Sequence, residues 1–281
     1  MNKPAAFWQC RNRLFDLSRP LIMGIVNATP DSFSDGGAHN DVQRAVAWGR
    51  KLAAEGADIL DVGGESTRPG ADEVSAEEEI ARVVPVIRAL AADGLAVSVD
   101  TSKPEVMQAS LEAGACILND VRAFEMPRAL ETAAASDAGL VIMHMRGTPQ
   151  TMQNDPNYAD VTNEIERYLI SRERALEALG VNPQRICWDA GFGFGKTVEH
   201  NFSILKHTAR FAAHSGAYLV GLSRKSFIGA ATGVQIPRER VTCSVAAALL
   251  AIERGANVVR VHDVLPMRQA IDVYEAMRRA P

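Results

Sequence analysis

The chain has 281 residues, 47% of them apolar, with a net charge of −4 and a pI near 5.9. This charge provides no basic surface for nucleic acid or for an anionic membrane. No apolar stretch reaches the roughly 18 residues that a membrane-spanning helix needs, and the N-terminal segment lacks the apolar core of a signal peptide. We therefore expect a single cytoplasmic domain over residues 1–281 that binds neither nucleic acid nor membrane.

Eight short apolar runs recur along the chain, and seven of them follow a glycine that ends a helix-like stretch. Glycine commonly follows a helix because it adopts the left-handed conformation without a Cβ clash. Continuous apolar runs are typical of parallel strands that are buried on both faces. The runs span 21–27, 59–64, 97–102, 116–121, 140–145, 186–191, 219–223 and 258–263, and the glycines are Gly56, Gly94, Gly114, Gly139, Gly180, Gly216 and Gly255. This pattern predicts an α/β fold, a single TIM (β/α)8 barrel.

Helix starts between these runs carry recognisable signals. Ser75 and Glu78 have the spacing of a capping box, and so do Ser102 and Glu105. A later helix, over residues 244–250, is apolar nearly all round, which is typical of a helix buried on more than one side. This last helix therefore indicates a subunit contact.

The apolar runs end on polar residues. In a TIM barrel the C-terminal ends of all strands open onto one face, where active sites are built. The ends are Asn27, Glu65, Asp100, Asn119, His144, Asp189, Ser223 to Lys225 and Arg260 to Asp263. We predict that these side chains converge on one pocket. Asp100, Asn119 and Asp189 would suit a flat polar ring with several N–H groups, because buried carboxylates need donors.

Cationic residues follow the last two runs. Arg224 and Lys225 follow the seventh run, and Arg260 and His262 belong to the eighth. Barrels often bind phosphate at the loops after strands seven and eight. Because Arg260 and His262 alternate with valines, both project to the same side of the strand. We expect a doubly cationic corner there that binds a phosphorylated end of the ligand.

Three connections are longer than a barrel needs, at residues 28–40, 65–75 and 146–159. Long loops on this face are often functional lids. We expect the loops after strands one and two to be mobile without ligand, with Phe33 and Arg68 at their tips over the pocket.

Two further motifs concern ligands. The segment GFGFGK at 191–196 does not have P-loop spacing, so Gly193 is expected to make room for a flat ligand beside Phe192 or Phe194. Asn27, with Asp31 and Asp35 beyond it, offers oxygen atoms for Mg²⁺.

Signatures of other chemistries are missing from the sequence. It contains no H-E-x-x-H, no Cys/His cluster and no G-x-S-x-G, which argues against a zinc site and a serine triad. The four cysteines, Cys10, Cys116, Cys187 and Cys243, are far apart, and we expect them to be reduced.

Together these segments resemble the dihydropteroate synthase family of folate biosynthesis. The matching segments are MGIVNATPDSFSDGG (23–37), DVGGESTRPGA (61–71), SVDTSKPEV (98–106), ILNDV (117–121), MHM (143–145), DAGFGFGK (189–196), GLSRKSFIG (221–229) and RVHDV (260–264). The resemblance implies condensation of 6-hydroxymethyl-7,8-dihydropterin diphosphate with 4-aminobenzoate, giving 7,8-dihydropteroate and diphosphate. It also implies Mg²⁺ as cofactor, a homodimer and, because the S-T-R-P-G segment is kept, inhibition by sulfonamides.

The resemblance further implies a role for individual residues. Asp100, Asn119, Met143, Asp189, Gly221, Lys225 and Arg260 would bind the pterin. Asn27, Arg68, Arg260 and His262 would bind the diphosphate, with Asn27 and Asp35 at the metal. Thr67, Arg68, Pro69, Phe194, Lys225 and Ser226 would bind 4-aminobenzoate, and Phe33, Ser34 and Asp35 belong to the first loop. The catalytic residues would be Asp100, Lys225, Arg260 and His262.

Two positions depart from the family pattern. Ala28 stands where the family commonly has Val, and Ala190 where it has Pro; neither change removes a functional side chain.

Two other functions are alternatives to the synthase. A pterin-binding, corrinoid-dependent methyltransferase could share the barrel and the Asp/Asn/Asp set. It would not need the S-R-K-S segment or the cationic residues of strand eight. A non-catalytic pterin-binding barrel would be expected to lack Asn27, Arg260 or His262, which are all present.

Overall fold

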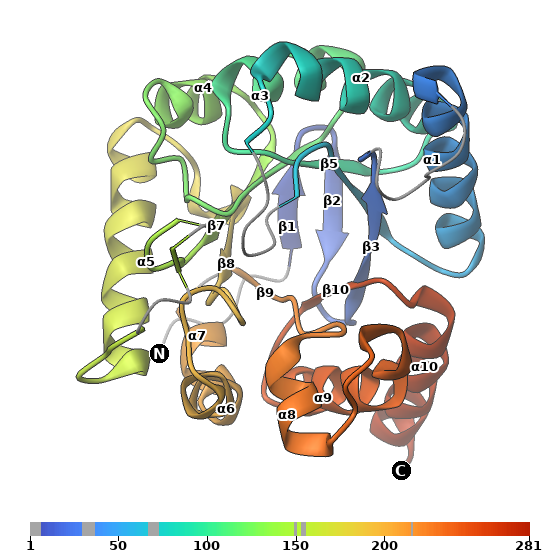
Figure 1. Ribbon diagram of the computed structural model, residues 1–281. Helices are drawn as coiled ribbons and strands as arrows, with labels where there is room; N and C mark the ends of the chain where they lie inside the picture. The colour runs from blue at the N-terminus through green and yellow to red at the C-terminus, as the bar shows by residue number, and fades with distance from the viewer. Residues whose placement is uncertain (1–6, 30–36, 67–72, 149–150, 153–155, 215) are drawn as a thin grey trace.

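The computed structural model describes residues 7–29, 37–66, 73–148, 151–152, 156–214 and 216–281. Within these residues eight parallel strands close into a barrel in the order β10-β3-β4-β5-β6-β7-β8-β9, and helices surround it (Figure 1). The predicted TIM barrel is therefore confirmed. None of the helices in the described ranges is both long and apolar enough to cross a bilayer.

Each barrel strand coincides with one of the eight apolar runs. The strands are β3 (Leu21–Asn27), β4 (Ile59–Gly63), β5 (Val97–Asp100), β6 (Ile117–Asp120), β7 (Gly139–Met143), β8 (Ile186–Asp189), β9 (Ala217–Val220) and β10 (Val258–Val261). Nearly every residue in them is buried, because helices cover the outside and side chains fill the inside. Polar residues at the ends of the runs are thereby carried to one rim.

The helices follow the strands in the expected alternation. They are α1 (Gly37–Ala54), α2 (Ala76–Ala92), α3 (Pro104–Ala113), α4 (Ala129–Ala135), α5 (Val161–Ala178), α6 (Val198–Lys206), α7 (Thr208–Ala212), α8 (Ser226–Thr232), α9 (Val241–Glu253) and α10 (Val264–Arg279). Short 3₁₀ turns occupy Pro183–Arg185 and Pro237–Glu239. Since α1 begins at Gly37, the first long loop ends at residue 36, and the predicted end at residue 40 is wrong.

Most of the predicted helix-ending glycines have the expected backbone. Gly56, Gly94, Gly114, Gly180 and Gly255 all have a positive φ, between 78° and 112°. Gly139 is different, because α4 already ends at Ala135 and Gly139 is the first residue of β7. Its lack of a side chain has another reason, described below.

The two predicted capping boxes have different outcomes. Ser75 caps α2, since its side chain accepts a hydrogen bond from the backbone N–H of Glu78. The Ser102 prediction is wrong: Lys103 is the N-cap of α3, and no side chain bonds there. Ser102 instead donates its hydroxyl proton to the buried carboxylate of Asp120, which needs donors more than the helix end does.

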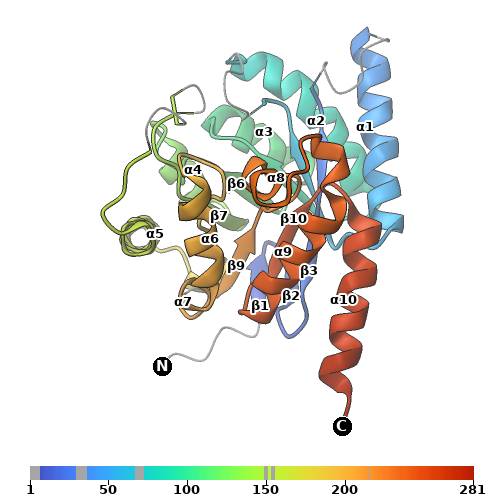
Figure 2. The ribbon, with the colours of Figure 1, turned by 60° about the horizontal axis from the view of Figure 1, so that its bottom comes forward.

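An N-terminal hairpin that the sequence did not reveal closes the barrel at the N-terminal ends of its strands. Its strands are β1 (Phe7–Cys10) and β2 (Arg13–Asp16), which pair antiparallel. The buried Trp8 donates from Nε1 to the carbonyl of Arg185, just before β8, at 2.9 Å. Figure 2 shows the hairpin at the lower end of the barrel, on the same side as both chain ends. It covers the apolar residues at that end of the barrel.

The tightest contact of this hairpin is with Gly139. A Cβ added at Gly139 would lie 2.2 Å from Sγ of Cys10, so only glycine fits. We expect Gly139→Ala to lower the free energy of unfolding in urea by about 1–3 kcal/mol, the usual cost of overpacking. In a Cys10→Ala background, where Sγ is gone, the same substitution should cost much less. An equal cost in both backgrounds would contradict this explanation.

Candidate active site

The strand register brings the predicted polar residues to one level of the rim. Asn27 of β3 pairs with Gly63 of β4, Gly63 with Asp100 of β5, and Asp100 with Asn119 of β6. Across the barrel Met143 of β7 pairs with Asp189 of β8. Because paired residues of parallel strands lie side by side, the predicted convergence on one rim is confirmed for these positions.

Arg260 of β10 reaches inside the barrel to carboxylates of β4 and β5. Its Nε donates to Oδ2 of Asp61 at 2.6 Å, and its Nη2 donates to Oδ2 of Asp100 at 2.7 Å. Asn119 donates from Nδ2 to the same Asp61 oxygen at 3.0 Å. These four residues come from β10, β4, β5 and β6, and we call them the Arg260 cluster.

Sequence reasoning missed Asp61. It lies inside an apolar strand run rather than at its end, and it is completely buried. The signal was a carboxylate in the middle of such a strand, because a buried charge requires a partner. Asp61 has that partner in Arg260, and its Oδ1 has no hydrogen-bond partner within the described part of the chain.

Charges within the cluster are strongly coupled. Burial raises the pKa of Asp100 to about 7, an effect that Arg260 opposes and the nearby Asp61 reinforces. Burial also lowers the pKa of the Arg260 guanidinium, but Asp61 and Asp100 outweigh it and the net shift is upward. Arg260 is therefore always charged, whereas Asp100 gains and loses its proton near neutral pH.

His262 is not the cation that the sequence suggested. Burial and the positive charge of Arg260 together lower its pKa to about 3, so the ring is neutral at pH 7. Ser223 Oγ accepts from the backbone N–H of His262 at 3.2 Å and lies 3.0 Å from Nδ1. The tautomer decides which group donates in this contact: a ring with its proton on Nε2 accepts at Nδ1 from the serine hydroxyl, whereas a ring with its proton on Nδ1 donates to the serine. The predicted doubly cationic corner is wrong, since only Arg260 of the pair is charged.

Lys225, just after the neighbouring strand β9, lies against an aromatic ring. Its Nζ is 4.2 Å from the ring centroid of Phe194. Burial lowers the pKa of Lys225 to about 8, and Arg260 contributes to the shift. Phe192 is buried in the core, stacked on Phe227, so of the two predicted aromatic walls only Phe194 is placed at the rim. A Cβ at Gly193 would lie 3.1 Å from Cδ of Lys225, so the glycine makes room for this lysine.

The glycine-rich segment after β8 is fixed by two buried polar residues. Asp189 accepts from the N–H of Gly191 at 2.7 Å, and burial raises its pKa while Lys225 and Lys196 oppose the shift. Lys196 donates from Nζ to the carbonyls of Gly191 at 2.8 Å and Phe194 at 2.9 Å. The sequence did not reveal the structural role of Lys196, although this residue ends the GFGFGK segment. It holds the backbone that presents Phe194.

The start of the second long loop is anchored by ion pairs. Lys103 contacts Glu65, which begins that loop, and donates to the fully buried Glu79 of α2 at 2.6 Å. Burial raises the pKa of Glu79, and Lys103 lowers it. The loop tips lie outside the described residues, and with them the predicted positions Phe33, Ser34, Asp35, Thr67, Arg68 and Pro69.

Two further predicted positions border the same rim. Ser226 is exposed at the first position of α8, next to Lys225. A Cβ added at Gly221 would meet nothing within 4 Å, so open space lies over the backbone just after β9. Both positions are therefore accessible to a ligand at the rim.

Comparison with known proteins gives the same picture over nearly the full chain. Residues 23–262 match the model of the family described as pterin binding enzyme. The dihydropteroate synthase of Escherichia coli K12 is 49% identical over 93% of both chains. The chain belongs to the dihydropteroate synthase family.

Solved structures of family members share the fold closely. The Xanthomonas albilineans dihydropteroate synthase with 4-aminobenzoic acid has a TM-score of 0.93 at 48% identity, covering 99% of this chain and all of that one. The Yersinia pestis dihydropteroate synthase in a sulfonamide drug complex has a TM-score of 0.92 at 44% identity, covering 98% and 100%. These relatives are all dihydropteroate synthases, which favours synthase activity over the methyltransferase and the non-catalytic alternatives.

A metal site was predicted at Asn27 and Asp35. Within the described ranges no group of three or more His, Cys, Asp and Glu residues could hold a metal ion. Asn27 supplies one amide oxygen at the end of β3, and Asp35 lies outside those ranges. One protein oxygen fits Mg²⁺ when phosphate oxygens and water supply the other ligands. The residues thus fit a Mg²⁺ ion that arrives with a diphosphate.

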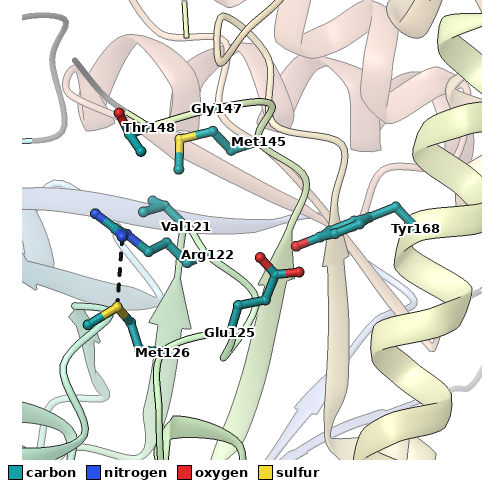
Figure 3. A pocket seen from close by; sticks show the side chains of 8 residues that line it. All are labelled: Val121, Arg122, Glu125, Met126, Met145, Gly147, Thr148 and Tyr168. Atoms are coloured by element: carbon teal, nitrogen blue, oxygen red, sulfur yellow. Dashed lines mark hydrogen bonds between the residues drawn. The ribbon is translucent and has the colours of Figure 1, made fainter. Parts of the chain in front are cut away.

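A separate pocket of about 300 Å³ lies outside the ends of β6 and β7 (Figure 3). It is lined by Val121, Arg122, Glu125, Met126, Met145, Gly147, Thr148 and Tyr168. In Figure 3 the Glu125 carboxylate faces the Tyr168 hydroxyl, and Arg122 donates to Sδ of Met126 at 3.7 Å. None of these residues was predicted as a site residue, and none belongs to the Arg260 cluster.

The Arg260 cluster predicts the effect of removing the Asp61 charge. Asp61→Asn keeps the shape but leaves Arg260 with Asp100 as its only carboxylate partner, so the guanidinium and Asn119 lose their fixed orientation. We expect the affinity for dihydropterin diphosphate, measured by calorimetry, to fall roughly tenfold. The matched control is Asp272→Asn, which breaks an exposed Arg–Asp pair on α10 and should change nothing. Equal affinities in the two variants would refute the role of Asp61.

Proposed function

We propose that the chain condenses 6-hydroxymethyl-7,8-dihydropterin diphosphate with 4-aminobenzoate, giving 7,8-dihydropteroate and diphosphate in the synthesis of tetrahydrofolate. This makes it a transferase of an alkyl group. The observation that carries the proposal is the Arg260 cluster, in which a guanidinium, two carboxylates and an amide from four strands meet at the rim. The X. albilineans structure with 4-aminobenzoic acid supports the second substrate.

The pterin ring fits the buried polar groups of the rim. Its exocyclic amine and ring N–H groups would donate to Asp189 and Asn119, while Asp100 accepts from the reduced ring. Such donors would offset the cost of burying the Asp189 carboxylate, whose pKa is raised by burial. Met143 and Gly221 would contact the ring faces, since Met143 is buried beside Asp189 in the register and open space lies over Gly221.

The diphosphate would lie between Asn27, Arg260 and His262, whose Nε2–H would donate in the tautomer that accepts from Ser223 at Nδ1. A neutral histidine donates a hydrogen bond without competing for the proton that Asp100 releases near pH 7. Mg²⁺, held by Asn27 and the diphosphate, would neutralise the leaving group when bound. In this proposal, Asp35 of the first long loop would join Asn27 at the metal, and Arg68 of the second loop would bind the diphosphate.

The chemistry needs no strong base. The bond between the pterin methylene carbon and the diphosphate oxygen breaks, and its electron pair leaves with the diphosphate. The amine lone pair of 4-aminobenzoate then forms the new C–N bond, and the nitrogen loses one proton afterwards. Ionised Asp100 stabilises the positive charge that develops on the pterin, and Arg260 stabilises the departing diphosphate.

The aminobenzoate would bind beside the pterin at Phe194, Lys225 and Ser226. The Phe194 ring and the Lys225 ammonium are already in contact, and they offer an aromatic wall and a charge for the benzoate. Thr67, Arg68 and Pro69 of the second loop would close this subsite. Sulfonamides, which resemble 4-aminobenzoate in shape, would compete there, as the drug complex of the Y. pestis relative supports.

We also propose a homodimer that pairs through α9 and α10. One face of α9 is buried in the chain, with Ser244, Ala247 and Ala248, while Leu250 on the other face is exposed. On α10, Val273 and Met277 are exposed as well. Exposed apolar side chains on two helices that pack together support pairing of two copies, which sedimentation at several protein concentrations would test.

The test of the proposed reaction uses purified protein, dihydropterin diphosphate, Mg²⁺ and radiolabelled 4-aminobenzoate. Labelled dihydropteroate should form, should disappear with EDTA, and should decrease when a sulfonamide competes with 4-aminobenzoate. No product under any condition, with the pterin still bound by calorimetry, would overturn the proposed reaction and return the methyltransferase and binding-protein alternatives.

The raised pKa of Asp100 predicts an acidic limb in the rate profile. Because the ionised carboxylate is the active form, kcat/KM should rise with pH and level off above about 7. Asp100→Asn should lower kcat about 100-fold and remove this limb, because the amide does not titrate in this range. A limb at the same pH in the Asn variant would assign it to another group.

A further inference from the structure

Arg224, in the middle of the S-R-K-S segment, has a backbone conformation that is rare for its residue type. Its φ is 60°, in the left-handed region that disfavours side chains with a Cβ. The residue lies between Ser223, which contacts His262, and Lys225, which contacts Phe194. A costly conformation at this point persists only where the surroundings impose it.

Tertiary contacts hold the backbone N–H, the carbonyl and the guanidinium of Arg224. Its N–H donates to Oγ of Ser244 on α9 at 2.9 Å, and its carbonyl accepts from Nη1 of Arg240 at 2.9 Å. Its guanidinium forms a bidentate pair with Asp263, at 2.9 Å from Nε and 2.6 Å from Nη2. The guanidinium thus binds a carboxylate of its own chain. The sequence had instead predicted that it binds a phosphorylated ligand.

These contacts continue the pairing of β9 and β10 beyond the ends of both strands. The backbone register of the two strands ends at Val220 and Val259. Beyond it, Ser223 contacts His262, and the next residue on each side, Arg224 and Asp263, forms the bidentate pair. Two consecutive side-chain pairs therefore join the segments that carry Lys225 and His262.

We propose that the Arg224–Asp263 pair is a positioning element, which holds Lys225 and His262 at a fixed separation beyond the neighbouring ends of β9 and β10. The inference rests on the proposed function, because Lys225 and His262 are the residues that would contact the substrates. Arg224 and Asp263 themselves touch no reacting atom. Bidentate pairing suits this role because two parallel hydrogen bonds fix orientation as well as distance.

The first test removes one charge without changing shape. Asp263→Asn should lower kcat/KM about tenfold, and it should speed amide hydrogen exchange at the N–H groups of Arg224 and His262 by a similar factor. The matched control is Asp93→Asn, which breaks the bidentate Arg50–Asp93 pair between α1 and the end of α2. The control should stay within about twofold of the wild type in both measurements.

A second test reverses the pair. Arg224→Asp or Asp263→Arg alone places like charges together, and each should lower kcat/KM more than Asp263→Asn does. The double variant restores opposite charges, and Asp tolerates the left-handed backbone better than most residues. We expect it to exceed both single variants about fivefold or more in kcat/KM.

The outcomes are separable from those of the reaction test. If Asp263→Asn matches the Asp93→Asn control in rate and exchange, and the reversed pair recovers nothing, the positioning role is overturned. If the wild type makes no dihydropteroate, the proposed function fails, while the exchange measurement still reports whether the pair holds His262 and Arg224. If Asp263→Asn speeds exchange at both amides but leaves kcat/KM unchanged, the pair holds the two segments together but has no part in catalysis.

Discussion

The rim of this barrel depends on one buried guanidinium. Arg260 lies between the carboxylates of Asp61 and Asp100, and a charge buried this deeply is tolerated only because both are within hydrogen-bond distance. The same arrangement determines the other ionisations. Arg260 opposes the effect of burial on Asp100, and it adds to the effect of burial on Lys225 and His262. Removing this charge would therefore change the ionisation of Asp100, Lys225 and His262 together.

Around this centre, several residues act by fixing backbone rather than by facing a ligand. Lys196 holds the glycine-rich segment, Lys103 holds the start of the second loop, and Arg224 joins the ends of β9 and β10. Each is a basic side chain that donates to carbonyl or carboxylate oxygens of the same chain. A loop on the active face needs such partners because it lacks the regular hydrogen bonds of the strands it follows.

The sequence predicted more of the fold than of the site. The eight strands lay where the apolar runs predicted, because a buried parallel strand leaves a continuous apolar signature. The β1–β2 hairpin was not found, because its burial pattern is mixed and its partners, Arg185 and Gly139, are more than 120 residues away along the chain. For the site, Asp100, Asn119 and Asp189 could be found as polar ends of apolar runs. Asp61 lies within a run, where the only signal was that a carboxylate in a buried strand requires a charged partner.

By itself, therefore, the sequence determined the barrel, the face that carries the polar residues and the family that shares its motifs. Only the tertiary structure decided the charge of His262, which depends on burial and on Arg260, and the partners of Arg224 and Arg260. The physical reason is that strand periodicity is a local property of the chain. Ionisation and ion pairing instead depend on distances between segments up to 199 residues apart, which the closure of the barrel sets.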